Sequence, residues 1–146
     1  MQTWQQQRAA FVLDRLDEAL SDHASDTANN VRWKEGLRQL SRSLPMTLRT
    51  TSLGQTLAML HKAEAGSADS LVLEWIKRWS PRAGYFDGKG DILRACMDAD
   101  QRQYLAAQAE VMMLLGWVKL LAVARIPAPL SPADGNNQQE VADAPE

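Results

Sequence analysis

Cysteine and histidine are scarce in this sequence, and their scarcity excludes several kinds of site. The only cysteine is Cys96, so the chain cannot form an internal disulfide and gives no sign of an oxidising compartment. The two histidines, His23 and His61, lie far apart, and neither has a partner at metal-binding spacing. Because a zinc site needs about four ligands, we predict no metal centre and expect solvated or helix-capping roles for both histidines.

Long apolar runs are also missing. The most apolar stretch, Val111 to Ile126, is shorter than the roughly 20 residues of a membrane span, and Lys119 and Arg125 interrupt it. The N-terminal stretch Met1–Arg8 contains no apolar signal core. We therefore expect a soluble cytoplasmic protein that does not bind a membrane.

Basic residues are absent from the end of the chain. All 16 lysines and arginines lie before residue 126, whereas the remainder of the chain contains four acidic side chains. Residues 1–125 thus hold 16 bases against 14 acids, a net charge of +2, although the whole chain has a net charge of −2. Prolines and acids leave residues 127–146 little to pack, so we predict a disordered acidic tail after one helical domain at 1–126.

Helical spacing dominates what is present. Apolar residues recur at steps of three and four in several segments, and we find no convincing alternating strand. We predict an all-α fold, a compact bundle of about five to six helices. The expected helices span residues 3–21, 31–44, 53–63, 69–79, 91–97 and 100–125.

Prolines and apolar stripes indicate the helix ends and the centre of the bundle. Pro45 fits poorly inside a helix and marks a stop or a new first turn, and Ser80-Pro81 ends the fourth helix. The apolar face expected for the first helix is Ala9, Leu13, Leu16 and Leu20. The last helix is the longest and has the widest apolar stripe, so we expect it to be central. Most of the five tryptophans have the spacing of core residues, with Trp4 and Trp79 as alternative interface anchors.

Motifs that look like catalytic or binding sites have simpler explanations. The acidic face at 14–18 contains an arginine and lacks a fourth ligand, and the loop at 87–91 lacks the glutamate of a calcium-binding EF-hand. Residues 52–55 match a helix capping box, because a phosphate loop needs a GxxxxGK[ST] or GxGxxG motif. Acids beside Cys96 do not activate its thiol. We predict no catalytic residue, no metal and no cofactor, and hence a protein that is not an enzyme.

Basic residues concentrate in and after the second expected helix. They are Arg32, Lys34, Arg38, Arg42 and Arg49, opposed only by Glu35. Lys34, Arg38 and Arg42 are spaced four apart, so they share one helix face turned away from the leucines. This face is either simply solvated or an RNA-facing strip, because phosphate contacts come mainly from arginine and lysine.

Several segments, taken in order, resemble a known family. They are Gln6-Gln7-Arg8-Ala9-Ala10-Phe11, Leu44-Pro45, Leu53-Gly54-Gln55-Thr56-Leu57-Ala58, and the late set Tyr104, Ala109-Glu110-Val111 and Leu114-Leu115-Gly116-Trp117-Val118-Lys119. Their order and spacing resemble the small helical subunit of the type III-B (Cmr) CRISPR effector complex. The resemblance runs from about residue 5 to 125.

The resemblance implies a function as well as a compact helical fold. Copies of that subunit stack into a minor filament beside the filament that holds the guide RNA, and neighbouring subunits carry out cleavage. The implied partners are other Cmr effector subunits, further copies of the chain, and guide and target RNA. Where the family has two bases after its late tryptophan this chain has one, which shifts the expected contacts toward the second helix. The expected RNA-contact residues are Arg8, Lys34, Arg38, Arg42 and Arg49.

Two alternatives remain at this point. One is the related small subunit of the type III-A complex, or another helical scaffold. The other is a helical DNA-binding regulator, for which residues 31–44 are the only candidate recognition helix.

Overall fold

The computed structural model describes residues 1–61 and 64–127. These residues form six α-helices and contain no strand. The helices are α1 Trp4–Asp22, α2 Ala28–Thr50, α3 Leu53–His61, α4 Ala68–Ala83, α5 Ile92–Asp98 and α6 Gln101–Arg125. The predicted all-α bundle is therefore confirmed. The predicted tail at 127–146 lies, apart from Pro127, outside the described residues.

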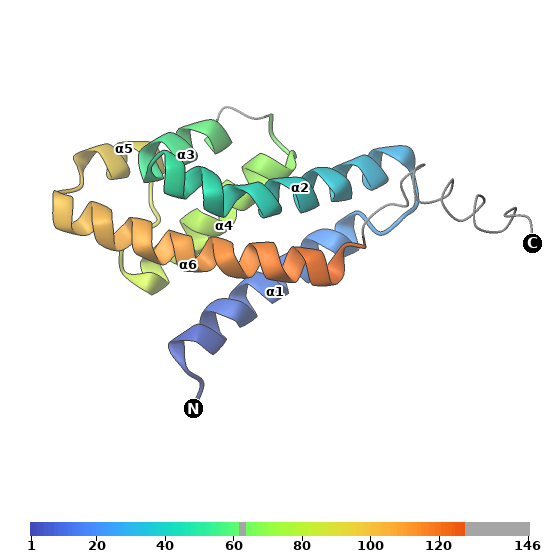
Figure 1. Ribbon diagram of the computed structural model, residues 1–146, viewed down its shortest axis with the longest axis horizontal. Coiled ribbons are helices and arrows are strands. Elements are labelled where there is room, and N and C mark those ends of the chain that lie inside the picture. The colour runs from blue at the N-terminus through green and yellow to red at the C-terminus, as the bar shows by residue number, and fades with distance from the viewer. Residues whose placement is uncertain (62–63, 128–146) are drawn as a thin grey trace, which may run out of the picture.

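α6 is the central helix of the bundle. It runs antiparallel to α2 along one side of the molecule, while α1 crosses it and α4 lies behind both (Figure 1). α3 and α5 close the end of the bundle near the start of α6. By length and composition alone α6 would also pass as a membrane span, but core helices pass the same test. Its buried side chains are Ala107, Val111, Leu114, Leu115, Val118 and Ala122.

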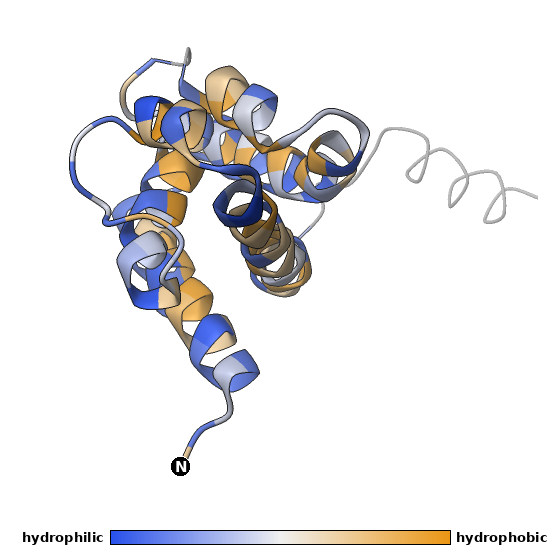
Figure 2. Ribbon diagram, turned by 90° about the vertical axis from the view of Figure 1, so that its left-hand side faces the viewer, coloured by the Kyte–Doolittle hydropathy of each residue, from blue (hydrophilic) through white to orange (hydrophobic). Residues whose placement is uncertain are grey.

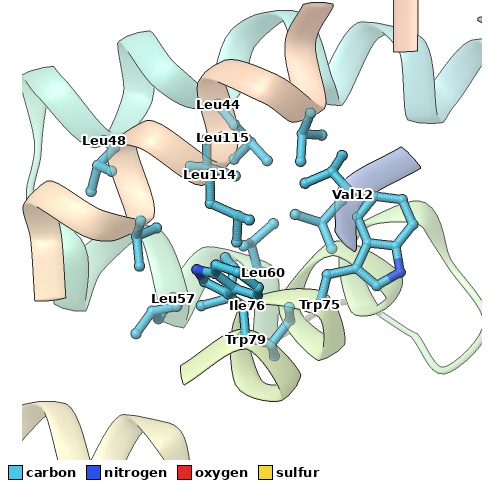
Figure 3. Close-up of a cluster of buried hydrophobic side chains, with 14 of the residues drawn as sticks. Val12, Leu44, Leu48, Leu57, Leu60, Trp75, Ile76, Trp79, Leu114 and Leu115 are labelled. Atoms are coloured by element: carbon cyan, nitrogen blue, oxygen red, sulfur yellow. The ribbon is translucent and has the colours of Figure 1, made fainter. Parts of the chain in front are cut away.

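All six helices contribute side chains to one core, part of which is shown in Figure 3. α4 contributes Trp75, Ile76 and Trp79, all at most 2% exposed, and the other helices surround them mainly with leucines. Burial of each such side chain stabilises the fold by roughly 1.5–3 kcal/mol. Two further tryptophans, Trp33 and Trp117, are partly buried against this core. The expectation that most tryptophans lie in the core is therefore confirmed.

The prediction that α2 stops or restarts at Pro45 is wrong. α2 continues through this residue to Thr50. Pro45 cannot donate a hydrogen bond to the carbonyl of Ser41, which weakens the helix locally. Leu44 and Leu48 are both buried, however, and their burial on either side of the proline keeps the chain helical.

The prediction that α4 ends at Ser80-Pro81 is also wrong, because α4 extends to Ala83. Pro81 leaves the carbonyl of Lys77 without its usual helical donor. The Ser80 hydroxyl lies 2.7 Å from that carbonyl and donates a hydrogen bond to it. The Ser80 side chain thus replaces the missing N–H of Pro81. The helix continues to Ala83, and Gly84, with a φ of 82°, is its C-cap.

The start of α3 is closed by side chains from α6. Ser52 accepts a hydrogen bond from the Gln55 N–H at 3.4 Å, which is one half of the predicted capping box. Two further N–H groups in the first turn donate to α6: that of Leu53 to Gln108 Oε1 at 3.0 Å and that of Gly54 to the Tyr104 hydroxyl at 2.9 Å. These contacts occupy the helix N-terminus, so this end of α3 is a packing joint between helices.

Candidate nucleic-acid interface

α2 holds four predicted RNA-contact residues, Lys34, Arg38, Arg42 and Arg49, on one side of the helix, here called the α2 basic strip. The strip borders the face that α2 turns into the core, which is formed by Leu37, Ser41, Leu44 and Leu48. Arg42 and Arg49 are exposed, and Lys34 and Arg38 are half-buried. The structure therefore brings these four side chains to one helix.

The charges of the α2 basic strip are not neutralised within the part of the chain that the structure describes. None of its four side chains forms an ion pair there. The nearest acid in sequence, Glu35, accepts a hydrogen bond from Gln39 instead, at 2.9 Å. Arg38 Nε is buried and finds no hydrogen-bond partner among residues 1–61 and 64–127. Because this atom is buried, the side chain can meet an outside partner only through its accessible terminal guanidinium nitrogens.

Arg32 differs from the α2 basic strip although it lies on the same helix. Its Nη2 donates to Asn29 Oδ1 at 3.0 Å, and its Nε donates to the Ala28 carbonyl at 3.4 Å. These local bonds hold its guanidinium at the N-terminal end of α2. We therefore do not count it as part of the strip.

Arg8 is placed quite differently from the other predicted contacts. It is only 4% exposed, and its guanidinium binds Glu110 of α6 through two hydrogen bonds of 2.8 and 2.9 Å. Trp79 Nε1 donates to the same carboxylate at 2.9 Å. Arg8 therefore joins α1 to α6 inside the protein, and we exclude it from the proposed RNA contacts.

A local signal for the burial of Arg8 exists in the sequence. The buried stripe of α1 is Arg8, Val12, Leu16 and Ala19, at steps of four, four and three. The expected stripe was centred on Ala9 and Leu13, which are only half-buried. An arginine in line with buried apolar residues indicates a buried charge that needs a partner, but the partner lies at Glu110, far along the chain.

The pKa of Glu110 lies below its usual value. Burial is the largest single influence and opposes ionisation, but hydrogen bonds from Arg8 and Trp79 and the charge of Arg8 together outweigh it. Burial also raises the pKa of the Cys96 thiol, so the protonated form predominates at neutral pH. Cys96 is buried, which accounts for an inert thiol without a contribution from the acids beside it.

The other candidate motifs have structural roles. His23 ends α1, where its Nδ1 lies 3.0 Å from the Ala19 carbonyl, and its ring stacks on Trp33 at 3.6 Å. His61 is exposed. Asp87 accepts a hydrogen bond from the Lys89 N–H, as expected for a turn. Among the described residues no cluster of three or more histidines, cysteines or acids could hold a metal ion.

The two candidate interface tryptophans lie together but differ in exposure. Trp79 is fully buried and binds Glu110, so it is a core residue. Trp4 is 40% exposed and packs on Trp79, with 5.1 Å between ring centroids. Only Trp4 remains available as a surface anchor.

The comparisons with known proteins identify the family. No curated protein matches the chain. The family model described as "CRISPR-associated protein (Cas_Cmr5)" matches residues 4–125, from the first residue of α1 to the last residue of α6. The match thus covers the whole helical bundle and confirms the resemblance found in the sequence. The chain belongs to the Cmr5 family of CRISPR-associated small subunits of type III-B systems.

Proposed function

We propose that this chain is a non-catalytic small subunit of a type III-B RNA-guided effector complex that serves antiviral defence. It stacks in several copies as a minor filament, associates with the other Cmr subunits in the cytoplasm, and helps hold guide and target RNA. The α2 basic strip faces the RNA. Family membership supports the complex, and the surface chemistry of α2 supports the contact with RNA.

One observation carries the RNA contact: the α2 basic strip carries charge that no acid among the described residues neutralises. Arg42 and Arg49 are exposed to solvent. Phosphate oxygens could neutralise these charges and accept their hydrogen bonds. A strip of four bases offers few phosphate contacts, so we expect the isolated chain to bind RNA weakly and to need the assembled complex for a firm grip.

The side chains that could take part in catalysis have structural roles in this bundle. Cys96 is buried with a raised pKa, and the hydrogen bonds of Glu110 are taken up inside the bundle by Arg8 and Trp79. The Cmr5 family is itself a structural small subunit. Cleavage of target RNA then belongs to neighbouring subunits of the complex.

The first test is a pull-down of the tagged chain from its native host, with sequencing of the RNA that co-purifies. We expect guide RNAs derived from CRISPR repeats, together with the other Cmr subunits. Guide RNA accompanied by type III-A subunits would instead assign the chain to that related complex. Recovery of the chain alone, with sequence-specific binding to duplex DNA, would favour a DNA-binding regulator.

The second test reverses charge within the α2 basic strip. The double variant Arg38→Glu with Arg42→Glu should weaken RNA protection by the assembled complex. The slope of log K against log salt concentration should become shallower by about 0.7–0.9 for each lost phosphate contact. The matched control is Arg78→Glu with Arg94→Glu, which changes two exposed arginines on α4 and α5 by the same charge. Circular dichroism should show that both variants keep the helical fold. Equal RNA protection by both variants would mean that the strip is merely solvated.

A further inference from the structure

The acidic end of the chain follows the helical bundle in sequence and has no role in the proposed function. The family model matches residues 4–125, and Pro127 is the last residue that the structure describes. Beyond it the sequence holds four acids, Asp134, Glu140, Asp143 and Glu146, and no base. Four negative charges on one segment favour contact with a surface of positive charge.

The α2 basic strip matches this segment in charge. Its four positive charges equal the four acids in number, and none of them forms an ion pair among the described residues. Within the described ranges no other helix holds as many bases as α2. Some bases elsewhere already have acidic partners, such as Arg125, which pairs with Asp17 at 3.2 Å. The strip is therefore the group of positive charges that the bundle leaves open to a partner.

The strip lies on the flank of α2 that faces away from α4. On the other flank Trp33 Nε1 donates a hydrogen bond of 3.1 Å to the carbonyl of Gly66, just before α4. The four bases of the strip are turned about 100–180° away from Trp33 around the helix axis. α6 runs antiparallel along α2, so its C-terminal end lies beside the first half of α2 (Figures 1 and 2). Pro127, from which the acidic segment continues, therefore lies at the same end of the bundle as Lys34.

The acidic segment is long enough to cover the whole strip. The strip extends about 22 Å along α2, from residue 34 to residue 49 at 1.5 Å per residue. The first acid, Asp134, is seven residues beyond Pro127, a distance of up to about 25 Å for an extended chain. The stretch from Asp134 to Glu146 spans up to about 40 Å when extended. The four acids can therefore reach all four bases without any change in the bundle.

We propose that residues 134–146 dock on the α2 basic strip of the same chain and shield it from RNA. Exposed ion pairs are individually weak and are screened by salt. The segment is tethered, however, which raises its concentration at the strip to the order of 1 mM. Docked and open states should then have similar populations at low salt, and RNA can displace the segment because each nucleotide brings a phosphate. The docking itself needs no RNA, whereas the shielding rests on the proposed function.

Zero-length cross-linking tests the docking without RNA. A carbodiimide joins a carboxylate to an amine in contact with it, and Lys34 is the only lysine of the strip. Only product with the mass of one chain is digested, so that links within a chain are counted. At low salt Lys34 should link to the acidic segment at least about fivefold more often than Lys77, a lysine on α4 that is also half-buried, because docking concentrates carboxylates at the strip. Equal yields at both lysines would overturn the proposal.

Charge reversal within the strip separates docking from mere proximity. The double variant Arg38→Glu with Arg42→Glu keeps Lys34 as the reporter but repels the acids, so the yield at Lys34 should fall at least about fivefold. In the parent, a salt concentration of 1 M, where the Debye length is about 3 Å, should lower the yield to the same level. The matched control Arg78→Glu with Arg94→Glu should leave the low-salt yield unchanged. An unchanged yield in the strip variant, or an equal fall in both variants, contradicts docking on the strip.

RNA binding distinguishes the shielding from the proposed function. Replacing the four acids by their amides should raise the affinity of the free chain for a labelled single-stranded RNA by about two- to fivefold at low salt, the gain from freeing a strip that is covered for about half to four-fifths of the time. If the strip is needed for RNA binding but the amides give no gain, the shielding is wrong. Equal RNA binding by the parent and by Arg38→Glu with Arg42→Glu would instead show that the proposed RNA contact fails, and the cross-links would still decide the docking.

Discussion

At the scale of single residues, the ion pair between Arg8 and Glu110 is the feature whose loss we expect to cost most. Both groups are largely buried, with side chains 4% and 13% exposed. Glu110→Gln removes the countercharge of Arg8 and should destabilise the protein by about 2–4 kcal/mol, because a buried guanidinium would be left uncompensated. Urea unfolding of the parent and the variant measures this difference.

A second substitution serves as the control for this prediction. Arg8→Met removes the buried charge, so the double variant should recover most of the loss, while the amide of Glu110→Gln can still accept the Trp79 hydrogen bond. If the double variant is less stable than Glu110→Gln alone, then Arg8 contributes by packing its side chain and not through its charge.

The same pair gives the stability a defined pH dependence. The pKa of Glu110 is lower in the folded protein than in the unfolded chain, where glutamate titrates near 4.3. Its stabilising effect is therefore complete above that unfolded value and is lost as the pH falls through the lower, folded pKa. The stability difference between the parent and Glu110→Gln should be constant from about pH 6 to neutrality and shrink below about pH 4. A difference that stays constant to lower pH would mean that Glu110 is not the titrating group.

Residues differ in how far their roles could be predicted from the sequence. The α2 strip could be placed because its spacing and the leucines between its members are local. The burial of Arg8 could not be predicted, because its partner Glu110 is distant in the chain. The apolar residues of α1 also fit two different buried faces, one that contains Arg8 and one that contains Ala9. The unsatisfied Arg38 Nε was equally hidden, since burial of one atom depends on tertiary packing.

At the scale of helices, Ser80 and Pro81 should act as one unit. Ser80→Ala removes the donor to the Lys77 carbonyl and should destabilise the protein by about 1–2 kcal/mol. Pro81→Ala restores a backbone N–H at that place, so Ser80→Ala should cost much less when it is combined with Pro81→Ala. Thermal or urea unfolding of the four proteins of this cycle measures the coupling. Additive effects would show that the hydroxyl does not replace the missing N–H.

The helices themselves could be predicted more fully than their ends. All six occur near the expected positions, because apolar spacing is a strong local signal. The errors gather at polar or proline-containing boundaries. α2 begins at Ala28 rather than 31 because the Thr27 side chain accepts from the Asn30 N–H, and it passes Pro45 because the leucines on either side are buried. In both places a hydrogen bond or core contact outweighs the intrinsic preference of the residue.

At the scale of the whole molecule, the division of charge along the chain predicts how its last segment affects RNA binding. Residues 1–125 have a net charge of +2, and the remainder contributes four negative charges. The described helical bundle extends to Ile126, which is 3% exposed and donates its N–H to the Ala122 carbonyl. A chain ending at Pro127 should therefore unfold at the same urea concentration as the full chain, and should bind RNA more tightly at low salt because the net repulsion of phosphate is removed.

A matched variant separates net charge from any other effect of the shortened chain. Replacing the four acids Asp134, Glu140, Asp143 and Glu146 by their amides keeps the length and removes the same charge. If repulsion is the cause, both proteins should gain RNA affinity equally at low salt, and both gains should fade as ionic strength shortens the Debye length to about 8 Å at 0.15 M. Fluorescence anisotropy with a labelled single-stranded RNA measures this at two salt concentrations. A gain for the shortened chain alone would mean that the segment obstructs the RNA-binding surface sterically, and no gain for either would mean that its charge does not reach the α2 basic strip.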